Sequence, residues 1–566
     1  MPLTPRETLR LAVTGLCLVA AGCTTPRQPA PGLYVPPARR LETPAPAAQG
    51  TAPPSAGRVS PTPSPTPPRP SVTRAPARPS APPSAAPETT AELAALPVAL
   101  NAAGSIGLAA ETENYLVLSG ANEKPVASWT LAATEAGGAS AWRLLAAPQA
   151  ASPPPRGDAH LAFRRWQQQL VATLPQQPRY ALSQASRPLK VGDTQDLWVI
   201  TQFDAVAPKE VRVRADVVEV GTHCYVLVDQ AATTRAASRE RLRTRAREVA
   251  RTFDATVYPT NTRLFGSEPS PGVDGDPRVF ILLTPAVGDY GRDTTLGYFS
   301  QRDAFPADTR ADGPTARSNA RELLYVSSQI VLEGDPEDYM GTIAHEFQHM
   351  INFNQKVLVG KNRISDDLWV DEGMSMYAIE ACGYGLMAGG EVLANHVRQF
   401  QAEPEAYSLS DWEGNPEGIG YGPVYLLTVY LADRFGEDFI KEVVTSKGLG
   451  AANLQALLAA RGTSLTAVLH DWALANLLDG AEQATDPRHQ YKMLEMRGDN
   501  GSTRLLGFRT LDLDLPGQLR VPGRPFSARY YRLPDGALSP RFTLAGGGTG
   551  VRVREFPRLV LPEAGF

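Results

Sequence analysis

Two histidines and a glutamate in one short segment have the types and spacing for metal-dependent hydrolysis. His345, Glu346 and His349 occur in the segment HEFQH, so the histidines are four residues apart. In a helix this spacing puts both imidazoles on one face, one turn apart, where both can bind one ion at about 2.0 to 2.1 Å. Glu346 lies beside them and can act as a base on a water whose pKa zinc lowers to about 7. We therefore expect a hydrolytic zinc site.

A third protein ligand is needed, because catalytic zinc usually has three and leaves the fourth position to water. The downstream segment SDDLWVDEGMSMYAIE is predicted to form a second helix. Glu372 on this segment lies 23 residues after His349, which leaves room for the chain to turn and pack the two helices together. Glu372 is the predicted third ligand, and its neighbour Asp371 is the alternative.

Hydrolysis of a carbonyl compound also needs a hydrogen-bond donor for the negative charge that develops on the oxygen. Tyr421 follows a glycine-rich stretch, GIGYG, that is predicted to be an exposed turn. We predict that Tyr421 is this donor and a catalytic residue together with Glu346. A structural role for the Tyr421 ring remains open, and His396 and His470 are alternative donors.

The first of these helices has clear start signals. Asp335 suits the N-cap, Pro336 the first helical position, and Glu337 and Asp338 the positive end of the helix dipole. A segment rich in helix formers (231–253), two apolar runs typical of buried strands (278–285 and 322–328) and a series of helices to about residue 490 surround the motif. Residues 230–495 are the predicted catalytic domain.

Mostly β regions are predicted on both sides of this domain. Alternating apolar and polar residues at 115–120, 127–133, 196–203, 211–220 and 224–229 indicate short strands, interrupted by a helix at about 158–173. We interpret 91–229 as a mostly β N-terminal region of one or two subunits, and 496–566 as a small β-sandwich module. The predicted fold class is therefore a multidomain α+β protein.

The N-terminal residues indicate export and a lipid anchor. Arg6 and Arg10 precede an apolar run, 11–21, that is too short to span a membrane and that ends in Ala-Gly-Cys at Cys23. This pattern predicts a lipoprotein signal peptide at 1–22 with lipid attached to Cys23; a plain secretory signal is the alternative. Residues 23–90 hold 20 of the 51 prolines and are predicted to be a disordered tether. We expect a protein exported and anchored to the cell envelope.

The composition argues against nucleic acid as a partner and is compatible with a soluble enzyme domain. A formal net charge of -4 with 43% hydrophobic residues gives no basic field that would attract nucleic acid. Apart from Cys17 and Cys23, the chain contains only Cys224 and Cys382. They could form a disulfide in an oxidising compartment, but their distance in sequence favours two buried thiols.

The segments HEFQHMINF and WVDEGMSMYAIE resemble the gluzincin metallopeptidases, and among them the hyicolysin family of secreted neutral peptidases. The resemblance extends from about residue 180 to 440. It implies a zincin-like catalytic domain, zinc on His345, His349 and Glu372, Glu346 as general base, and a protein substrate.

One position departs from the pattern of the thermolysin-like gluzincins. In those enzymes an aspartate four residues after the third ligand braces a zinc-binding histidine, and this chain has Met376 there. Ser375 or a backbone carbonyl could replace that brace, which matters because such outer partners change metal affinity 10- to 100-fold.

The sequence as a whole predicts a zinc metalloendopeptidase acting on proteins or peptides. An aminopeptidase is less favoured because no GxMEN-like segment precedes the motif helix. A zinc-binding or inactive envelope lipoprotein with a binding role is the alternative from another functional class.

Overall fold

The computed structural model divides by its contacts into two units, Met1–Glu88 and Thr89–Phe566. All residues that the structure describes belong to the second unit. They are 114–121, 126–134, 144–145, 159–173, 187–202, 208–232, 234–287, 295–306, 317–416, 420–481, 484–512, 517–533, 541–545 and 551–557. The predicted signal peptide, Cys23 and the proline-rich tether lie outside these residues.

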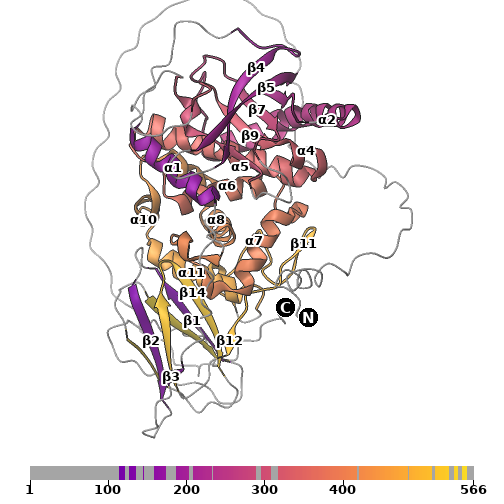
Figure 1. Cartoon of the computed structure of the whole chain (residues 1–566). Coiled ribbons are helices and arrows are strands. Elements are labelled where there is room, and N and C mark those ends of the chain that lie inside the picture. The colour runs from indigo at the N-terminus through magenta and orange to yellow at the C-terminus, as the bar shows by residue number, and fades with distance from the viewer. Residues whose placement is uncertain are drawn as a thin grey trace, which may run out of the picture. The chain divides into compact units, whose positions relative to one another are not determined.

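A six-stranded sheet supports the segment that carries the histidine motif (Figure 1). Its strand order is β4 (Thr194–Gln202), β5 (Lys209–Val220), β6 (Cys224–Asp229), β7 (Val279–Thr284), β9 (Leu323–Ser327) and β8 (Gly297–Phe299). Strands β6, β7 and β9 are parallel, whereas β4, β5 and β8 pair antiparallel with their neighbours. Every residue of β6, β7 and β9 is buried, as expected for continuous apolar strands covered on both faces.

Helices follow the strands and bring the motif to the sheet. After β6 come α2 (Ala236–Thr252), a π-helical turn (Phe253–Val257) and α3 (Tyr258–Phe265); after β9 come α4 (Ser328–Glu333) and α5 (Pro336–Phe353). Helix α5 contacts β8 and β9 on one side and α6 (Leu368–Ala381) on another, and α6 also packs against α8 (Tyr421–Phe435). The other α-helices of the described residues are α1 (Ala159–Thr173), α7 (Glu391–Ala402), α9 (Glu437–Thr445), α10 (Gly450–Ala459) and α11 (Leu465–Leu478).

Strands from the two ends of the described chain share two further sheets. β1 (Asn114–Gly120) lies between β14 (Ser527–Leu533) and β16 (Val551–Pro557), and β12 (Leu511–Asp512) completes that sheet. β2 (Val126–Thr134) lies between β15 (Arg541–Ala545) and β13 (Gly517–Gly523), with β3 (Leu144–Leu145) at the edge. A short hairpin of β10 (Asp499–Asn500) and β11 (Thr503–Arg504) precedes them.

The strands predicted within 91–229 therefore divide between two places. β1 and β2, together with β3, which was not predicted, pair with strands of the predicted C-terminal module, and β4 to β6 belong to the same sheet as β7 and β9. The boundary predicted between residues 229 and 230 thus falls inside one sheet, because β6 pairs with β7 along five residues. Periodicity identified the strands but could not identify their partners, since strand pairing is a long-range contact.

The mixed helix and sheet content predicted for the chain is confirmed for the described residues. Cys224 and Cys382 are buried free thiols, as predicted. Among the described residues, no helix is both long and apolar enough to cross a membrane.

Candidate active site

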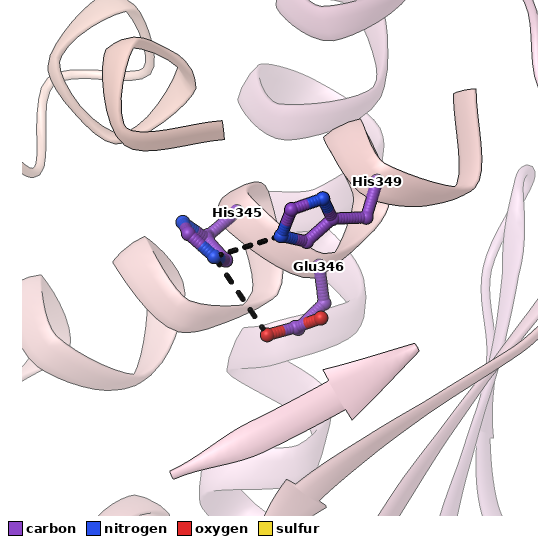
Figure 2. Close-up of side chains that lie close together, drawn as sticks. All are labelled: His345, Glu346 and His349. Carbon is purple, nitrogen blue, oxygen red and sulfur yellow. Dashed lines mark hydrogen bonds and ion pairs between the residues drawn. The ribbon is translucent and has the colours of Figure 1, made fainter. Parts of the chain in front are cut away.

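Helix α5 brings His345, Glu346 and His349 to one buried site (Figure 2). The helix begins where the sequence predicts, with Asp335 at the N-cap position, Pro336 in the first turn, and Glu337 and Asp338 close to the N-terminal end. Only 7% of His345, 3% of Glu346 and 2% of His349 is exposed. Residue types that usually face solvent are thus held inside the molecule, which needs compensating partners.

Glu372 of α6 meets the two imidazoles of α5. Its Oε2 atom lies 3.3 Å from His345 Nε2 and 3.4 Å from His349 Nε2, and the two Nε2 atoms are 3.0 Å apart. Glu372 is fully buried. Three potential metal-binding atoms from two helices therefore converge on one point.

These distances fit a tetrahedrally coordinated ion. Bonds of about 2.0 to 2.1 Å at tetrahedral angles hold ligand atoms about 3.3 Å apart, close to the three separations. His349 Nδ1 faces a carboxylate, which favours the proton on Nδ1 and leaves the Nε2 lone pair directed toward His345 Nε2. Two imidazole nitrogens and a carboxylate oxygen in such contact repel one another unless a proton or a metal ion lies between them. The residues present can therefore hold a divalent metal ion.

Glu346 lies slightly farther from His345 Nε2 than Glu372 does. Its Oε1 atom is 4.0 Å from His345 Nε2, and the backbone N–H of Phe299 in β8 donates to its Oε2 at 2.9 Å. His345, Glu346 and His349 also form a compact group that could itself bind an ion. The Glu372 oxygen lies nearer to His345 Nε2 than the Glu346 oxygen does.

The close approach of β8 to α5 depends on Gly297. A Cβ atom at this position would lie 2.7 Å from Thr342 Cγ2 of α5 and 2.8 Å from the carbonyl oxygen of Tyr325 in β9. Real Cβ contacts are longer, so a side chain here would push β8 away from α5. The glycine therefore helps to keep the Phe299 N–H within reach of Glu346.

A polar network holds the ring of His349. Asp371 Oδ1 lies 3.0 Å from His349 Nδ1 and accepts a hydrogen bond from Asn352 Nδ2 at 2.6 Å. Ser375 Oγ is also 3.0 Å from Nδ1, while its hydroxyl donates to Gln348. Asp371 and Ser375, one turn apart on α6, therefore contact His349 Nδ1, whereas position 376 carries a methionine.

The electrostatics of the site keep Glu372 ionised. Burial by itself would raise the pKa of Glu372, but Arg164 and His349 hold it well below its usual value. Burial lowers the pKa of His349, whereas the carboxylates of Asp371 and Glu372 outweigh that effect and raise it to about 9. Cation binding competes with this protonation, because a ligand imidazole must be neutral.

Tyr421 and His396 lie next to each other near this site. Tyr421 is the first residue of α8, and its ring centroid is 5.0 Å from that of His396 and 5.2 Å from that of Trp412. Burial lowers the pKa of Arg164, but Glu372, Glu346 and Asp371, with a smaller contribution from the Tyr421 phenol, raise it above its usual value. Desolvation together with His345 lowers the pKa of His396 to about 4. His470 is elsewhere, in α11, where its Nδ1 is 2.6 Å from Ser119 Oγ of β1.

Arg164 of α1 is a site residue that the sequence did not reveal. Its Nε atom lies 2.9 Å from Glu372 Oε1 and its Nη2 atom 3.5 Å from Glu346 Oε2. Nothing in the local sequence distinguishes it from the neighbouring Arg165. The backbone N–H of Phe299 was likewise not identifiable, because it acts through the position of a strand.

Comparison with known proteins gives one informative similarity. No known protein-family profile matches the chain. The chain is similar to the neutral metalloprotease ShpI of Staphylococcus hyicus, with 33% identity over 209 residues. The matched region covers 35% of this chain and 45% of the relative, so the chain spans less than half the length of the curated relative it matches. This partial similarity supports a relationship with the metallopeptidases.

Proposed function

We propose that the chain is a zinc-dependent endopeptidase of the hyicolysin type, with a zincin-like catalytic domain. The observation that carries this proposal is the convergence of His345, His349 and Glu372 within 3.4 Å of one another, with Glu346 beside them. The similarity to a metalloprotease supports the same reaction class. The substrate class would be protein or peptide.

A zinc ion at this point would polarise the scissile carbonyl and activate a water molecule for attack. The Phe299 N–H donates to Oε2 of Glu346, and Oε1 is the oxygen on the His345 side, where the reacting water would lie. Glu346 accepts a proton from that water and passes it to the amine nitrogen as the C–N bond breaks. Tyr421 would donate a hydrogen bond to the carbonyl oxygen as negative charge develops there.

The test compares the native protein with Glu346→Gln, using casein and internally quenched peptides. Glu337→Gln is the matched control, since Glu337 lies on the same helix but near its N-terminal end. Loss of the general base should lower kcat about 10²- to 10⁴-fold while zinc content stays near one ion per chain. If native protein and Glu346→Gln are equally inert toward many proteins, the catalytic proposal fails and a binding role replaces it.

Internal cleavage is separated from aminopeptidase action by blocked substrates. An endopeptidase cleaves peptides whose N-terminus is acetylated, because it does not need a free α-amine. We expect the acetylated and free forms of one peptide to be cut at the same internal bond. Cleavage restricted to the free form would make the protein an aminopeptidase.

We also propose that the protein is exported and held at the cell envelope by lipid on Cys23. The support is the sequence alone, an apolar run followed by Ala-Gly-Cys. Two or more acyl chains give firm anchoring, whereas one chain gives only marginal binding. Radiolabelled fatty acid should enter the native protein and not Cys23→Ser, and label in both proteins would exclude this attachment site.

A further inference from the structure

Helix α1 carries two adjacent arginines in opposite environments. Arg164 is only 4% exposed, whereas the side chain of Arg165 is 45% exposed and pairs with Glu413. Consecutive helix residues point about 100° apart, so one face of α1 is directed into the protein and the other toward solvent. Arg164 lies in the region 91–229, which the sequence separates from the predicted catalytic domain 230–495. It nevertheless contacts the candidate active site, through Glu346 and Glu372.

Several contacts fix the position of α1 against the catalytic elements. The Phe163 ring packs edge-on against Tyr298 of β8, with centroids 5.4 Å apart. The backbone N–H of Gln301, just after β8, donates to Gln167 Oε1 at 2.8 Å. Gln168 Nε2 donates to the carbonyl oxygen of Asp366, just before α6, at 3.3 Å. The helix is thus tied both to the strand beside Glu346 and to the segment that leads to Glu372.

We propose that Arg164 is a positioning residue that holds the carboxylates of Glu372 and Glu346 in their working orientations; this inference rests on the proposed zinc peptidase function. The two oxygens of Glu372 have different neighbours. Oε2 faces the two imidazoles, and Oε1 is 2.9 Å from Arg164 Nε. The guanidinium therefore fixes which oxygen is presented to the metal.

The same guanidinium reaches the base. Arg164 Nη2 lies 3.5 Å from Glu346 Oε2, the oxygen that also accepts from the Phe299 N–H. The hydrogen bond from the Phe299 N–H and the nearby charge of the guanidinium both act on Oε2, so together they restrict rotation of the carboxylate. A planar guanidinium has several donors in a fixed arrangement, so it can contact two carboxylates at once, which the single ammonium of lysine does less well.

Arg164 also adds positive charge beside a buried carboxylate. Glu372 is fully buried, and a carboxylate without a positive partner is costly in such surroundings. Metal-binding carboxylates commonly receive hydrogen bonds from a second layer of residues, and loss of such partners weakens metal affinity 10- to 100-fold. In this chain that layer comes from a helix far upstream of the metal-binding motif.

The experiment uses the full chain with Arg164→Met and Arg164→Lys, and Arg165→Met as the matched control on the solvent side of α1. Zinc affinity is measured by competition with a chelator, coordination by the visible absorption of the cobalt-substituted protein, and kcat and KM with a quenched peptide at saturating zinc. Far-UV circular dichroism checks folding. For Arg164→Met we expect zinc affinity about 10- to 100-fold weaker, an altered cobalt spectrum, and a fall in kcat larger than any change in KM.

Arg164→Lys should recover part of the affinity, and Arg165→Met should behave as the native protein. If Arg164→Met does not fold, the test rests on Arg164→Lys. Native zinc affinity and an unchanged cobalt spectrum in Arg164→Lys would show that the guanidinium is not needed and would overturn the proposal. In a Glu372→Gln background, removal of Arg164 should no longer affect zinc affinity, since its effect passes through that carboxylate.

The failures of the two proposals are distinguishable. A native protein that binds no zinc and cleaves nothing overturns the proposed function. An active, zinc-binding native protein with an indifferent Arg164→Met overturns only the role of Arg164. Increased activity in Arg164→Met would also overturn it, and would instead make α1 an inhibitory segment over the site.

Discussion

Replacement of Asp371 distinguishes a brace from a metal ligand. Asp371 precedes the proposed ligand Glu372, and its Oδ1 contacts His349 Nδ1 at 3.0 Å rather than the Nε2 atoms that face the proposed metal position. Asp371→Ala removes that partner and leaves Ser375 Oγ, also 3.0 Å from Nδ1, as the remaining contact. The ring of His349 is then held less firmly in place, and its Nε2 atom becomes less basic.

The expected loss follows from this geometry. Loss of an outer partner of a metal-bound histidine weakens affinity 10- to 100-fold, which corresponds to about 1.4 to 2.7 kcal/mol of binding free energy. The surviving contact to Ser375 places the expected value in the lower half of that range. Asp371→Asn keeps an oxygen that can accept from Nδ1 but removes the charge, so its loss should be smaller than that of Asp371→Ala.

Chelator competition on purified protein measures these differences, with Glu372→Gln as the reference for loss of a true ligand. Affinity unchanged in Asp371→Ala would refute the bracing role. A loss as large as that of Glu372→Gln would refute it in the other direction, because Asp371 would then itself bind the metal.

Three further outcomes are expected. Gly297→Ala should destabilise the protein by about 1 to 3 kcal/mol and lower peptidase activity, because its Cβ would contact α5 at 2.7 Å; urea unfolding and a quenched-peptide assay check this, and native values for both would contradict the tight contact. Burial raises the pKa of Glu322 from 4.5 to about 8, so the stability contributed by its protonated form is complete below the unfolded pKa and is lost as pH rises through the folded value. The melting temperature of Glu322→Gln should therefore fall less steeply than that of the native protein between about pH 5 and 8. Parallel curves of melting temperature against pH would exclude the raised pKa. Zinc should raise the melting temperature of metal-depleted native protein but not of His345→Ala, since binding to the folded state alone stabilises it; an equal shift in both would place the metal elsewhere.

Helix periodicity and local spacing made much of the site predictable. His345 and His349 had to share a face once a helix was expected from Asp335 onward, and the structure has that helix at Pro336–Phe353. The second helix was expected from the segment around Glu372 and is present at Leu368–Ala381. Both predictions rest on contacts between residues close in sequence, where backbone geometry leaves few choices.

The partners of these residues depend on contacts that are distant in sequence. Arg164 precedes Glu372 by more than two hundred residues, and the N–H of Phe299 reaches Glu346 from an edge strand. Nothing in the residue types around Arg164 selects it over Arg165, because their difference lies in which side of α1 packs inward.

The sequence by itself determined which atoms of α5 can bind an ion, since residue type and the spacing of one helical turn fix them. Tertiary structure decided what surrounds those atoms. It joined β4 to β6 with β7 and β9, paired β1 and β2 with strands from the other end of the chain, and brought Arg164 to Glu372. These outcomes require segments far apart in sequence to meet, and the free energy that selects such meetings comes from burial over the whole fold rather than from any local pattern.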